Sequence, residues 1–500
     1  RNGLTYVQAA ASAFNAPKVM KPIIKLIEEL ESLFPNTPLD IEFAVAGIQK
    51  KLILLQVRPL VLRENLEVSK DQEHHLQEIE QKVKTGFKSH PFLHGQTTVY
   101  GIMPDWNPAE IIGIRPRPLA LSLYKELITD NIWAYQRSNY GYKNLRSFPL
   151  LQQFQGLPYI DVRVSFNSFI PRDIDGDLAD KLVDYYINRL LSAPNLHDKV
   201  EFEIVFSCYS LNLPERFEAL GDAGFSKAER KLLSQSLLSL TNRIINKETG
   251  LWRVDRDKLN LLTTRRELLY QANMDPVSQI YWLLEDCKRY GTLPFAGLAR
   301  AGFIAVQMLK SMVAVGVMDE ADYDAFMGGL NTGSSQMVRD CSTLTRKEFL
   351  SIYGHLRPGT YDILSRRYDE APDMYFNFKS GLKKTKTLDT SIPFSLSPKQ
   401  LSDLGTLLRE HGLNTDVASL FEFLQAGITL REHAKFLFTK NLSDSISLIG
   451  HVGEEMGFLR EDLSFSDINV FYEMHNGAGD HKALLAKSIK QGQERYNITS

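Results

Sequence analysis

The sequence predicts an α+β chain in which one β-hairpin near the N-terminus is followed by two largely helical units. Residues 39–60 contain two short runs of alternating polar and apolar side chains, the pattern of half-buried strands. Apolar residues recur at helical spacing through much of the remaining sequence. A length of 500 residues with 43% hydrophobic content suits about three domains, each with its own core.

The first predicted element is an amphipathic helix over residues 19–34. Its apolar positions recur at helical spacing, so they form one stripe that can pack on the following hairpin. These positions are Val19, Met20, Ile23, Ile24, Ile27, Leu30 and Phe34. We interpret residues 1–63 as one unit that contains this helix and the hairpin.

The hairpin carries the polar groups that point to a specific chemistry. Asp40 and Glu42 are separated by one apolar residue, so an extended strand directs both carboxylates to one face. Gln56 and Arg58 repeat this spacing, and residues 46–50 suit a short connection between antiparallel strands. Carboxylates are ligands for Mg²⁺, and a guanidinium binds phosphate oxygens. A half-solvated strand pair with a surface ion pair explains the same alternation equally well.

These two strands resemble the end of the ATP-grasp nucleotide domain in the phosphoenolpyruvate-utilising dikinases. That family includes phosphoenolpyruvate synthase, pyruvate phosphate dikinase and the rifampin phosphotransferases. Its pattern is a helix, a D-I-E-[WF] strand, a turn and a strand that ends L-Q-[AVT]-R-P. This chain has Asp-Ile-Glu-Phe at 40–43 and Leu-Gln-Val-Arg-Pro at 55–59. The resemblance implies the C-terminal hairpin portion of an ATP-grasp domain, followed by largely α-helical central and linker domains.

The resemblance also implies roles for the four polar residues and the cofactors ATP and Mg²⁺. Glu42 would bind Mg²⁺, with Asp40 as a second metal contact, and Asp40 and Gln56 would line the nucleotide site. Arg58 would meet the ATP phosphates, so Arg58 and Gln56 are the expected catalytic groups. The metal and Arg58 would neutralise charge that develops on the transferring phosphoryl group.

Two further stretches are similar to the same family. Tyr353–Tyr368 is similar to its linker region, although Leu356 precedes Arg357 and Thr360 stands where a glutamate is common. Leu430–Phe465 is similar to the helical segment that precedes the phosphohistidine domain.

The family's phosphohistidine motif, Gly-Gly-x-x-[ST]-H-x-[AS], does not occur in the sequence. The nucleotide-binding lysine and arginine of the family would have to precede residue 1. We therefore expect an internal fragment of an ATP-dependent phosphotransferase, inactive alone. The parent protein would phosphorylate a histidine on a swivelling domain and pass the phosphoryl group to pyruvate or another small acceptor. The alternatives are an antibiotic (rifampin-type) phosphotransferase and a non-catalytic helical scaffold that retains an ATP-grasp remnant.

The rest of the chain is predicted as three segments. Residues 64–94 are a charged connecting helix, 95–378 a mostly helical central domain, and 391–500 a helical linker domain that opens at Ser397-Pro398. The polar run 379–390 is a linker. Within the central domain, 119–132, 178–191 and 232–245 have helical periodicity, whereas 200–206 alternates like a strand.

Three features of the central domain have competing interpretations. Asp105 and Trp106 are predicted either to line a substrate pocket or to precede a helix with Asn107 as its N-cap, and the cap is favoured. The glycine-rich run 328–335 lacks a P-loop lysine, so a helix C-cap followed by an N-cap explains it better. His355 either contacts substrate or is a buried structural histidine, and the structural role is favoured.

Composition excludes several function classes. Lys and Arg number 58 against 60 Asp and Glu, a net charge of −2 that leaves no electrostatic footprint for nucleic acid or an anionic membrane. Cys208, Cys287 and Cys341 are odd in number and widely spaced, which argues against a disulfide framework and for the cytoplasm. The apolar stretch 295–317 is interrupted by Arg300 and Lys310, so it is predicted as a core helix rather than a membrane span.

Overall fold

The computed structural model describes residues 21–35, 39–46, 51–59, 70–330, 333–376, 394–477 and 479–499. The chain separates into two compact units, one up to Gln72 and one from Glu73 to Thr499. Within these residues the chain is mostly helical with two small antiparallel sheets, which confirms the α+β class.

The first unit contains a helix and a two-stranded sheet. Helix α1 (Lys21–Leu33) is followed by strands β1 (Leu39–Ala46) and β2 (Lys51–Pro59), which pair antiparallel as predicted. Leu30 is the buried residue of α1. Residues 19–20 of the predicted helix and 47–50 of the predicted connection lie outside the described residues.

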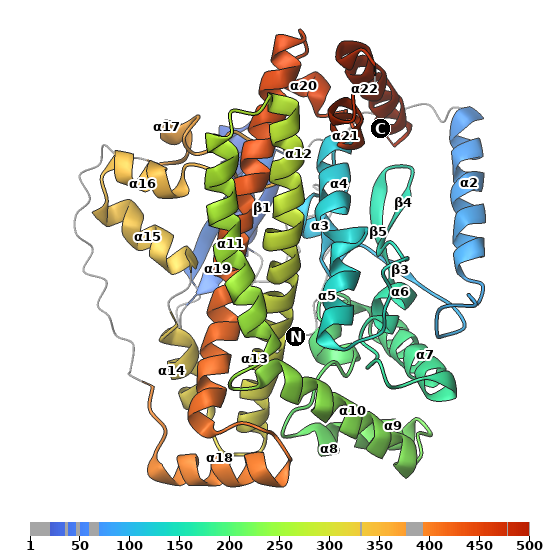
Figure 1. Cartoon of the computed structure of the whole chain (residues 1–500), viewed down its shortest axis with the longest axis vertical. Helices are drawn as coiled ribbons and strands as arrows, with labels where there is room; N and C mark the ends of the chain where they lie inside the picture. The colour runs from blue at the N-terminus through green and yellow to red at the C-terminus, as the bar shows by residue number, and fades with distance from the viewer. Residues whose placement is uncertain are drawn as a thin grey trace. The chain divides into compact units, whose positions relative to one another are not determined.

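The second unit contains the remaining elements, and Figure 1 shows their arrangement. Short helices come before, between and after the long helices along the chain. The α-helices are α2 (Lys70–Gly86), α3 (Pro108–Ile111), α4 (Pro118–Tyr124), α5 (Ile132–Tyr140), α6 (Val162–Asn167), α7 (Gly176–Ser192), α8 (Leu213–Arg216), α9 (Glu218–Asp222), α10 (Lys227–Ile245), α11 (Leu251–Gln271), α12 (Pro276–Asp286), α13 (Leu293–Ala314), α14 (Glu320–Gly328), α15 (Gly333–Thr343), α16 (Arg346–Tyr353), α17 (Pro372–Tyr375), α18 (Pro398–Glu410), α19 (Val417–Glu455), α20 (Arg460–Leu463), α21 (Asn469–His475) and α22 (His481–Ile498). The described residues also contain one 3₁₀ turn, η3 (Pro194–Leu196), and three π-helical turns, η2 (Lys125–Thr129), η4 (Val200–Ile204) and η5 (Cys287–Thr292).

Helices α11, α12, α13 and α19 run alongside one another and form the helical centre of this unit (Figure 1). The turn η5 joins α12 to α13, so Pro276–Ala314 is one continuous helix. Asp275 and Asp416 begin two of these helices, because each side chain accepts a hydrogen bond from a backbone N–H in the first turn. Pro276 at the first helical position has no N–H to leave unpaired.

Helices α13 and α19 cross where each has a glycine. A Cβ added to Gly302 would lie 2.9 Å from the carbonyl oxygen of Gly427. A Cβ added to Gly427 would lie 3.1 Å from the carbonyl oxygen of Ala301. The two backbones can therefore approach this closely only because both side chains are absent.

The continuous helix Pro276–Ala314 is the one candidate for a membrane span by length and composition within the described parts of the chain. In its most apolar stretch, 67% of the residues are buried inside the unit. Its buried residues include Leu298, Ile304 and Met308, which belong to a large core cluster. The prediction of a core helix over 295–317 is confirmed.

A three-stranded antiparallel sheet lies on the other side of the unit, in the order β3 (Tyr100–Gly101), β5 (Leu157–Asp161), β4 (Leu151–Phe154). Gln155 and Gly156 join β4 to β5, and both have positive φ, 50° and 84°. Two such residues make a type I′ turn, whose twist matches that of the strands. Asp161 ends β5 and caps α6 by accepting a hydrogen bond from the N–H of Val164.

Several helix predictions are confirmed. The periodicity over 119–132 corresponds to α4, η2 and α5, and the other two periodic stretches are α7 and α10. Ser397 caps α18, where its hydroxyl and the side chain of Gln400 each bond to the other's backbone N–H. The glycine-rich run contains the end of α14 at Gly328 and the start of α15 at Gly333.

The strand predicted for residues 200–206 is wrong. Residues Val200–Ile204 form the π-turn η4, closed by a hydrogen bond from the N–H of Val205 to the carbonyl of Val200. Val200 and Ile204 are both buried in the core, whereas Glu201 forms an ion pair with Arg300. Tertiary burial and ion pairing therefore override the local alternation of this segment.

The predicted boundary between segments 95–378 and 391–500 falls outside the described residues, as does the polar run 379–390. Within the described residues, α19 packs directly on α11, α12 and α13, and the two segments share both core clusters. The segment 64–94 contains the exposed helix α2. The division into domains and the ATP-grasp assignment stay predictions.

The close crossing of α13 and α19 predicts the effect of added methyl groups. Gly302→Ala places a Cβ against a backbone carbonyl that cannot rotate away, so it should lower the free energy of unfolding by about 1–3 kcal/mol. Gly328→Ala is the matched control, because Gly328 ends an exposed helix and a Cβ there meets nothing within 4 Å. It should leave stability unchanged or raise it by up to about 1 kcal/mol. Urea denaturation measures the free energy of unfolding of both variants. Equal effects of Gly302→Ala and Gly328→Ala would contradict the close approach of α13 and α19.

A buried carboxyl group lies among α5, α11 and α13. Asp255 is 6% exposed, and the Tyr140 hydroxyl donates to its Oδ2 at 2.8 Å. Burial raises the pKa of Asp255 to about 7, although the Tyr140 hydrogen bond and the nearby Lys258 lower it. The unfolded value is about 3.9. Folding is therefore favoured by protonation of Asp255, and this contribution is present below pH 4 and is lost as the pH rises to about 7.

Asp255→Asn should remove this pH dependence. Asparagine keeps an acceptor for Tyr140 and cannot ionise, so the variant should gain stability over wild type between pH 4 and pH 8, by at most about 4 kcal/mol. Urea denaturation at both pH values measures this difference. Asp257→Asn, an exposed position on the same helix, should change little with pH. Parallel pH curves for wild type and Asp255→Asn would show that Asp255 does not titrate in this range.

Candidate functional site

The backbone register of the two-stranded sheet groups the four positions predicted to bind MgATP. Asp40 pairs with Arg58 and Glu42 pairs with Gln56. Because directly opposite residues of antiparallel strands share a face, all four positions lie on one face of the ribbon. The register then shifts at a bulge between Glu42 and Phe43, and the pairing continues beyond it to Ala46 and Lys51.

The side chains of Asp40 and Arg58 lie outside the described residues, so their contacts stay a prediction. Glu42 and Gln56 are both exposed. No group of three or more His, Cys, Asp or Glu side chains that could hold a metal occurs among the residues described. The ribbon thus has the predicted order of groups along its backbone, and the role of each group in binding ATP or Mg²⁺ stays a prediction.

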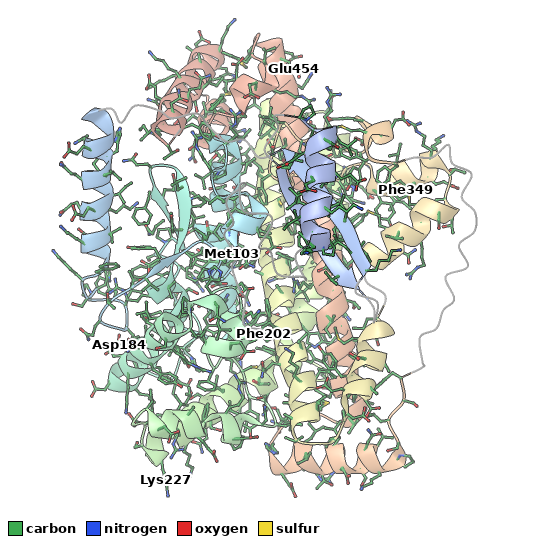
Figure 2. The ribbon with its side chains drawn as sticks, turned by 180° about the vertical axis from the view of Figure 1, so that it is seen from behind. Met103, Asp184, Phe202, Lys227, Phe349 and Glu454 are labelled. Atoms are coloured by element: carbon green, nitrogen blue, oxygen red, sulfur yellow. The ribbon has the colours of Figure 1, made fainter. Side chains whose placement is uncertain are left out.

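The second unit contains a cavity of ≈ 370 Å³ between α3, η4, α13 and α19. Asp105 and Trp106 line one side, Phe202 lines another, and Arg300 and Lys435 come from the two long helices. Figure 2 labels Phe202 and the nearby Met103, which lie toward the middle of this unit. The structure agrees with both interpretations of this loop, because Asp105 and Trp106 line a cavity and Asn107 is the N-cap residue of α3. A role in binding substrate stays a prediction.

Two arginines and two carboxylates form a buried ion network at this cavity. Arg137 donates from Nη2 to Asp105 Oδ1 at 2.9 Å, and Arg300 Nη1 lies 2.8 Å from Glu201 Oε2. The four side chains are only 2% to 10% exposed. Both guanidinium groups lie over the ring of Phe169, with their carbons 4.1 and 4.7 Å from its centroid, and Glu201 also lies 3.7 Å from Arg137 Nη2. The two pairs leave this buried group with no net charge.

The network acts differently on the two arginines. Burial and the neighbouring Arg300 lower the pKa of Arg137, although Asp105 and Glu201 oppose this. Burial also lowers the pKa of Arg300, but the Glu201 carboxylate and its neighbours outweigh burial and leave the pKa raised. Both guanidinium groups stay charged at neutral pH. Arg300 therefore offers a fixed positive charge at the wall of the cavity.

The loop before α3 is held in a strained conformation. Asp105, Trp106 and Asn107 have φ values of 49°, 46° and 38°, in the left-handed region that costs non-glycine residues about 1–3 kcal/mol each. Asn107 is the N-cap residue of α3 as predicted, but its side chain makes no cap hydrogen bond and instead donates to Glu110. Asp105 holds this loop through Arg137 and through Ser165, whose hydroxyl donates to Oδ2 at 3.0 Å.

His355 and Arg357 are both buried and contact α19. Arg357 donates from Nε to the Ser443 hydroxyl at 3.2 Å and from Nη2 to the Ser447 hydroxyl at 3.1 Å, which ties this loop to α19. His355 is 6% exposed and lies edge-on to Phe436. Burial, with Lys440 and Arg367 nearby, lowers the pKa of His355 to about 3, so its imidazole is neutral at pH 7.

The cavity contains residues that sequence reasoning did not select. Arg137, Glu201 and Tyr361 come from three separate segments, and only the folded chain brings them together. Arg300 could have been predicted from sequence to have a buried ion-pair partner, because an arginine inside an apolar helix is rarely buried unless it is paired. Arg431 and Lys435 lie in the stretch that is similar to the family, but nothing in their spacing indicates a cavity.

Comparison with known proteins adds no assignment. The sequence matches no family model, and it matches no curated protein. The functional argument therefore depends on the ribbon, the cavity and the sequence motifs already described.

The buried network predicts that Asp105→Asn destabilises the protein. The substitution keeps the shape of the side chain and removes the charge opposite Arg137, so it should lower the free energy of unfolding by about 3 kcal/mol or more. The matched control is Asp373→Asn, because Asp373 pairs with Arg346 at 2.9 Å on the surface. An exposed pair contributes less than about 1 kcal/mol. Similar losses in urea denaturation for the two variants would contradict the network.

Proposed function

We propose that the chain forms part of a cytoplasmic ATP-dependent phosphotransferase. In this proposal MgATP phosphorylates a histidine on a swivelling domain, which passes the phosphoryl group to pyruvate or another small acceptor. The observation that carries the proposal is the ribbon register, in which Asp40 faces Arg58 and Glu42 faces Gln56. It is the arrangement that the resemblance to the dikinases requires of this hairpin.

The chemistry of these four groups supports the proposal. Two carboxylates on one face provide hard oxygen ligands for Mg²⁺, which binds through one or two carboxylates together with phosphate oxygens. A guanidinium opposite them can donate two hydrogen bonds to phosphate oxygens and neutralise part of their negative charge. Phosphoryl transfer needs mainly positioning and charge neutralisation, so a metal and an arginine on a rigid ribbon supply much of what is required.

One observation favours the non-catalytic scaffold instead. Glu42 and Gln56 are exposed, whereas groups that act on a transferring phosphoryl group lie in sites closed to water. In the scaffold alternative these exposed side chains have no ligand, and replacing them changes nothing. The two hypotheses therefore differ in what substitution of the ribbon does to ATP chemistry.

Labelling of the protein encoded by the full reading frame tests the proposal. Incubation with Mg²⁺ and ATP labelled at the β- or γ-phosphate should give an acid-labile phosphohistidine, and EDTA should abolish it. Glu42→Gln and Arg58→Ala should each reduce this label on the order of 10²-fold, because each removes a charge that stabilises the transferring group.

The controls are exposed residues of the same unit. Glu31→Gln removes a carboxylate from α1, and Lys51→Ala removes a cation from β2. Both should keep wild-type labelling. Wild-type labelling in Glu42→Gln and Arg58→Ala, or no phosphohistidine in the wild-type protein, would replace the enzyme proposal with the scaffold.

A further inference from the structure

The cavity of the second unit has an aromatic wall. It is formed by Trp106, Phe202, Phe295, Phe303, Tyr361 and Phe438. The rings of Trp106, Phe295 and Phe438 contact one another in series, with centroids 5.9 and 5.0 Å apart, and Phe202 packs against Phe303 at 5.2 Å. A volume of ≈ 370 Å³ lies within the roughly 300–1,000 Å³ of small-molecule sites. A wall of this composition suits a flat apolar ligand.

Several buried donors at this cavity have no hydrogen-bond partner within the described residues. They are Trp106 Nε1, Arg300 Nε and the Tyr361 hydroxyl, which come from three different segments. Arg300 Nη1 also lacks a well-aligned partner, because its 2.8 Å approach to Glu201 does not have hydrogen-bond geometry. An unsatisfied buried polar group costs about 1–3 kcal/mol, and native structures contain few. Each of these atoms has less than 1 Å² of accessible surface, so an acceptor oxygen in the cavity reaches them only when the neighbouring side chains move.

The rim of the cavity adds positive charge. Lys199, Arg431 and Lys435 are exposed. Arg431 Nε lies 3.8 Å from Glu432 Oε1, whereas neither lysine has a carboxylate within 4.0 Å among the residues described. The Arg431 guanidinium lies 5.5 Å from the ring of Phe303, so a cation adjoins the aromatic wall directly. The full lining contains five cationic residues against four acidic ones, Asp105, Glu110, Asp198 and Glu201. The cavity therefore favours a ligand with negative charge.

The strained loop supports the same conclusion. Three successive residues, Asp105–Asn107, stay in the left-handed region because the buried Arg137 and Ser165 hold Asp105. This strain places the indole of Trp106 against Phe295 with an unpartnered Nε1. Strain of this kind is concentrated at ligand sites, where the surrounding structure maintains it.

From these observations we propose that the cavity is a binding site for an aromatic organic anion. The flat body lies against the aromatic wall, and the anionic group accepts hydrogen bonds from Trp106, Arg300 and Tyr361 beside the cations of the rim. The proposal does not depend on phosphoryl transfer, and it holds whether or not the ribbon binds ATP.

A pair of fluorescent probes tests this proposal. 1-Anilinonaphthalene-8-sulfonate has an aromatic body and one negative charge, and N-phenyl-1-naphthylamine has the same rings without the sulfonate. The protein should bind the sulfonate at one saturable site, and the uncharged probe should bind at least ten-fold more weakly. Equal affinities for the two probes would overturn the requirement for an anion.

Variants identify the site. Arg431→Ala combined with Lys435→Ala should weaken sulfonate binding at least ten-fold and leave the uncharged probe unchanged. Ala299→Phe fills the cavity from α13 and should weaken both probes. Lys227→Ala combined with Lys231→Ala removes two exposed cations of α10, away from the cavity, and should change neither probe.

Tyr361→Phe separates binding from folding. Because the hydroxyl has no partner in the described structure, its removal should leave the free energy of unfolding unchanged or raise it, and should still weaken the sulfonate. A loss of stability without a loss of affinity would assign Tyr361 a structural role and remove it from the site. Wild-type sulfonate affinity in both the Arg431/Lys435 and the Ala299→Phe variants would overturn the site itself.

Discussion

The approach of α13 to α19 at Gly302 and Gly427 is the constraint on which the second unit depends. Several of the residues that line the cavity lie on these two helices, near the crossing. Arg300 and Phe303 flank Gly302, and Arg431 follows Gly427 by four residues. A wider separation of the backbones would move both sets of side chains and enlarge the space between them. The absence of side chains at Gly302 and Gly427 thus helps to determine where the buried Arg300 and the exposed Arg431 lie.

Two of the π-turns lie at points that matter for the cavity. The turn η4 holds Val200 and Ile204 in the core and leaves Glu201 and Phe202 at the cavity. The turn η5 lies directly before Phe295 and Ala296 in the same continuous helix. An additional residue in a turn rotates the following side chains around the helix axis, and such insertions recur at functional sites.

Local sequence patterns predicted the parts of the fold that depend on local physics. The periodicity of α1, α7, α10 and α13, the pairing of β1 with β2 and the cap at Ser397 all follow from residue spacing or from one side chain and its neighbours. The ion network could not be predicted in this way, because Arg137 and Glu201 are 64 positions apart and meet only in the folded chain. Residues 200–206 show the same limit, since burial of Val200 and Ile204 prevailed over an alternating pattern. The ribbon positions were predictable because strand alternation is local, whereas the ligand they bind depends on groups elsewhere.

The anchoring of the loop that contains Arg357 has a mechanical consequence. Its guanidinium holds that loop on Ser443 and Ser447 of α19, and the same loop carries Tyr361, while α19 itself carries Lys435. The hydrogen bonds of Arg357 therefore link the loop of Tyr361 to the helix of Lys435. If α19 shifts along its axis, Tyr361 and Lys435 should move together, and the distance between them should stay the same. The width of the cavity would then change only when the residues of the other segments move.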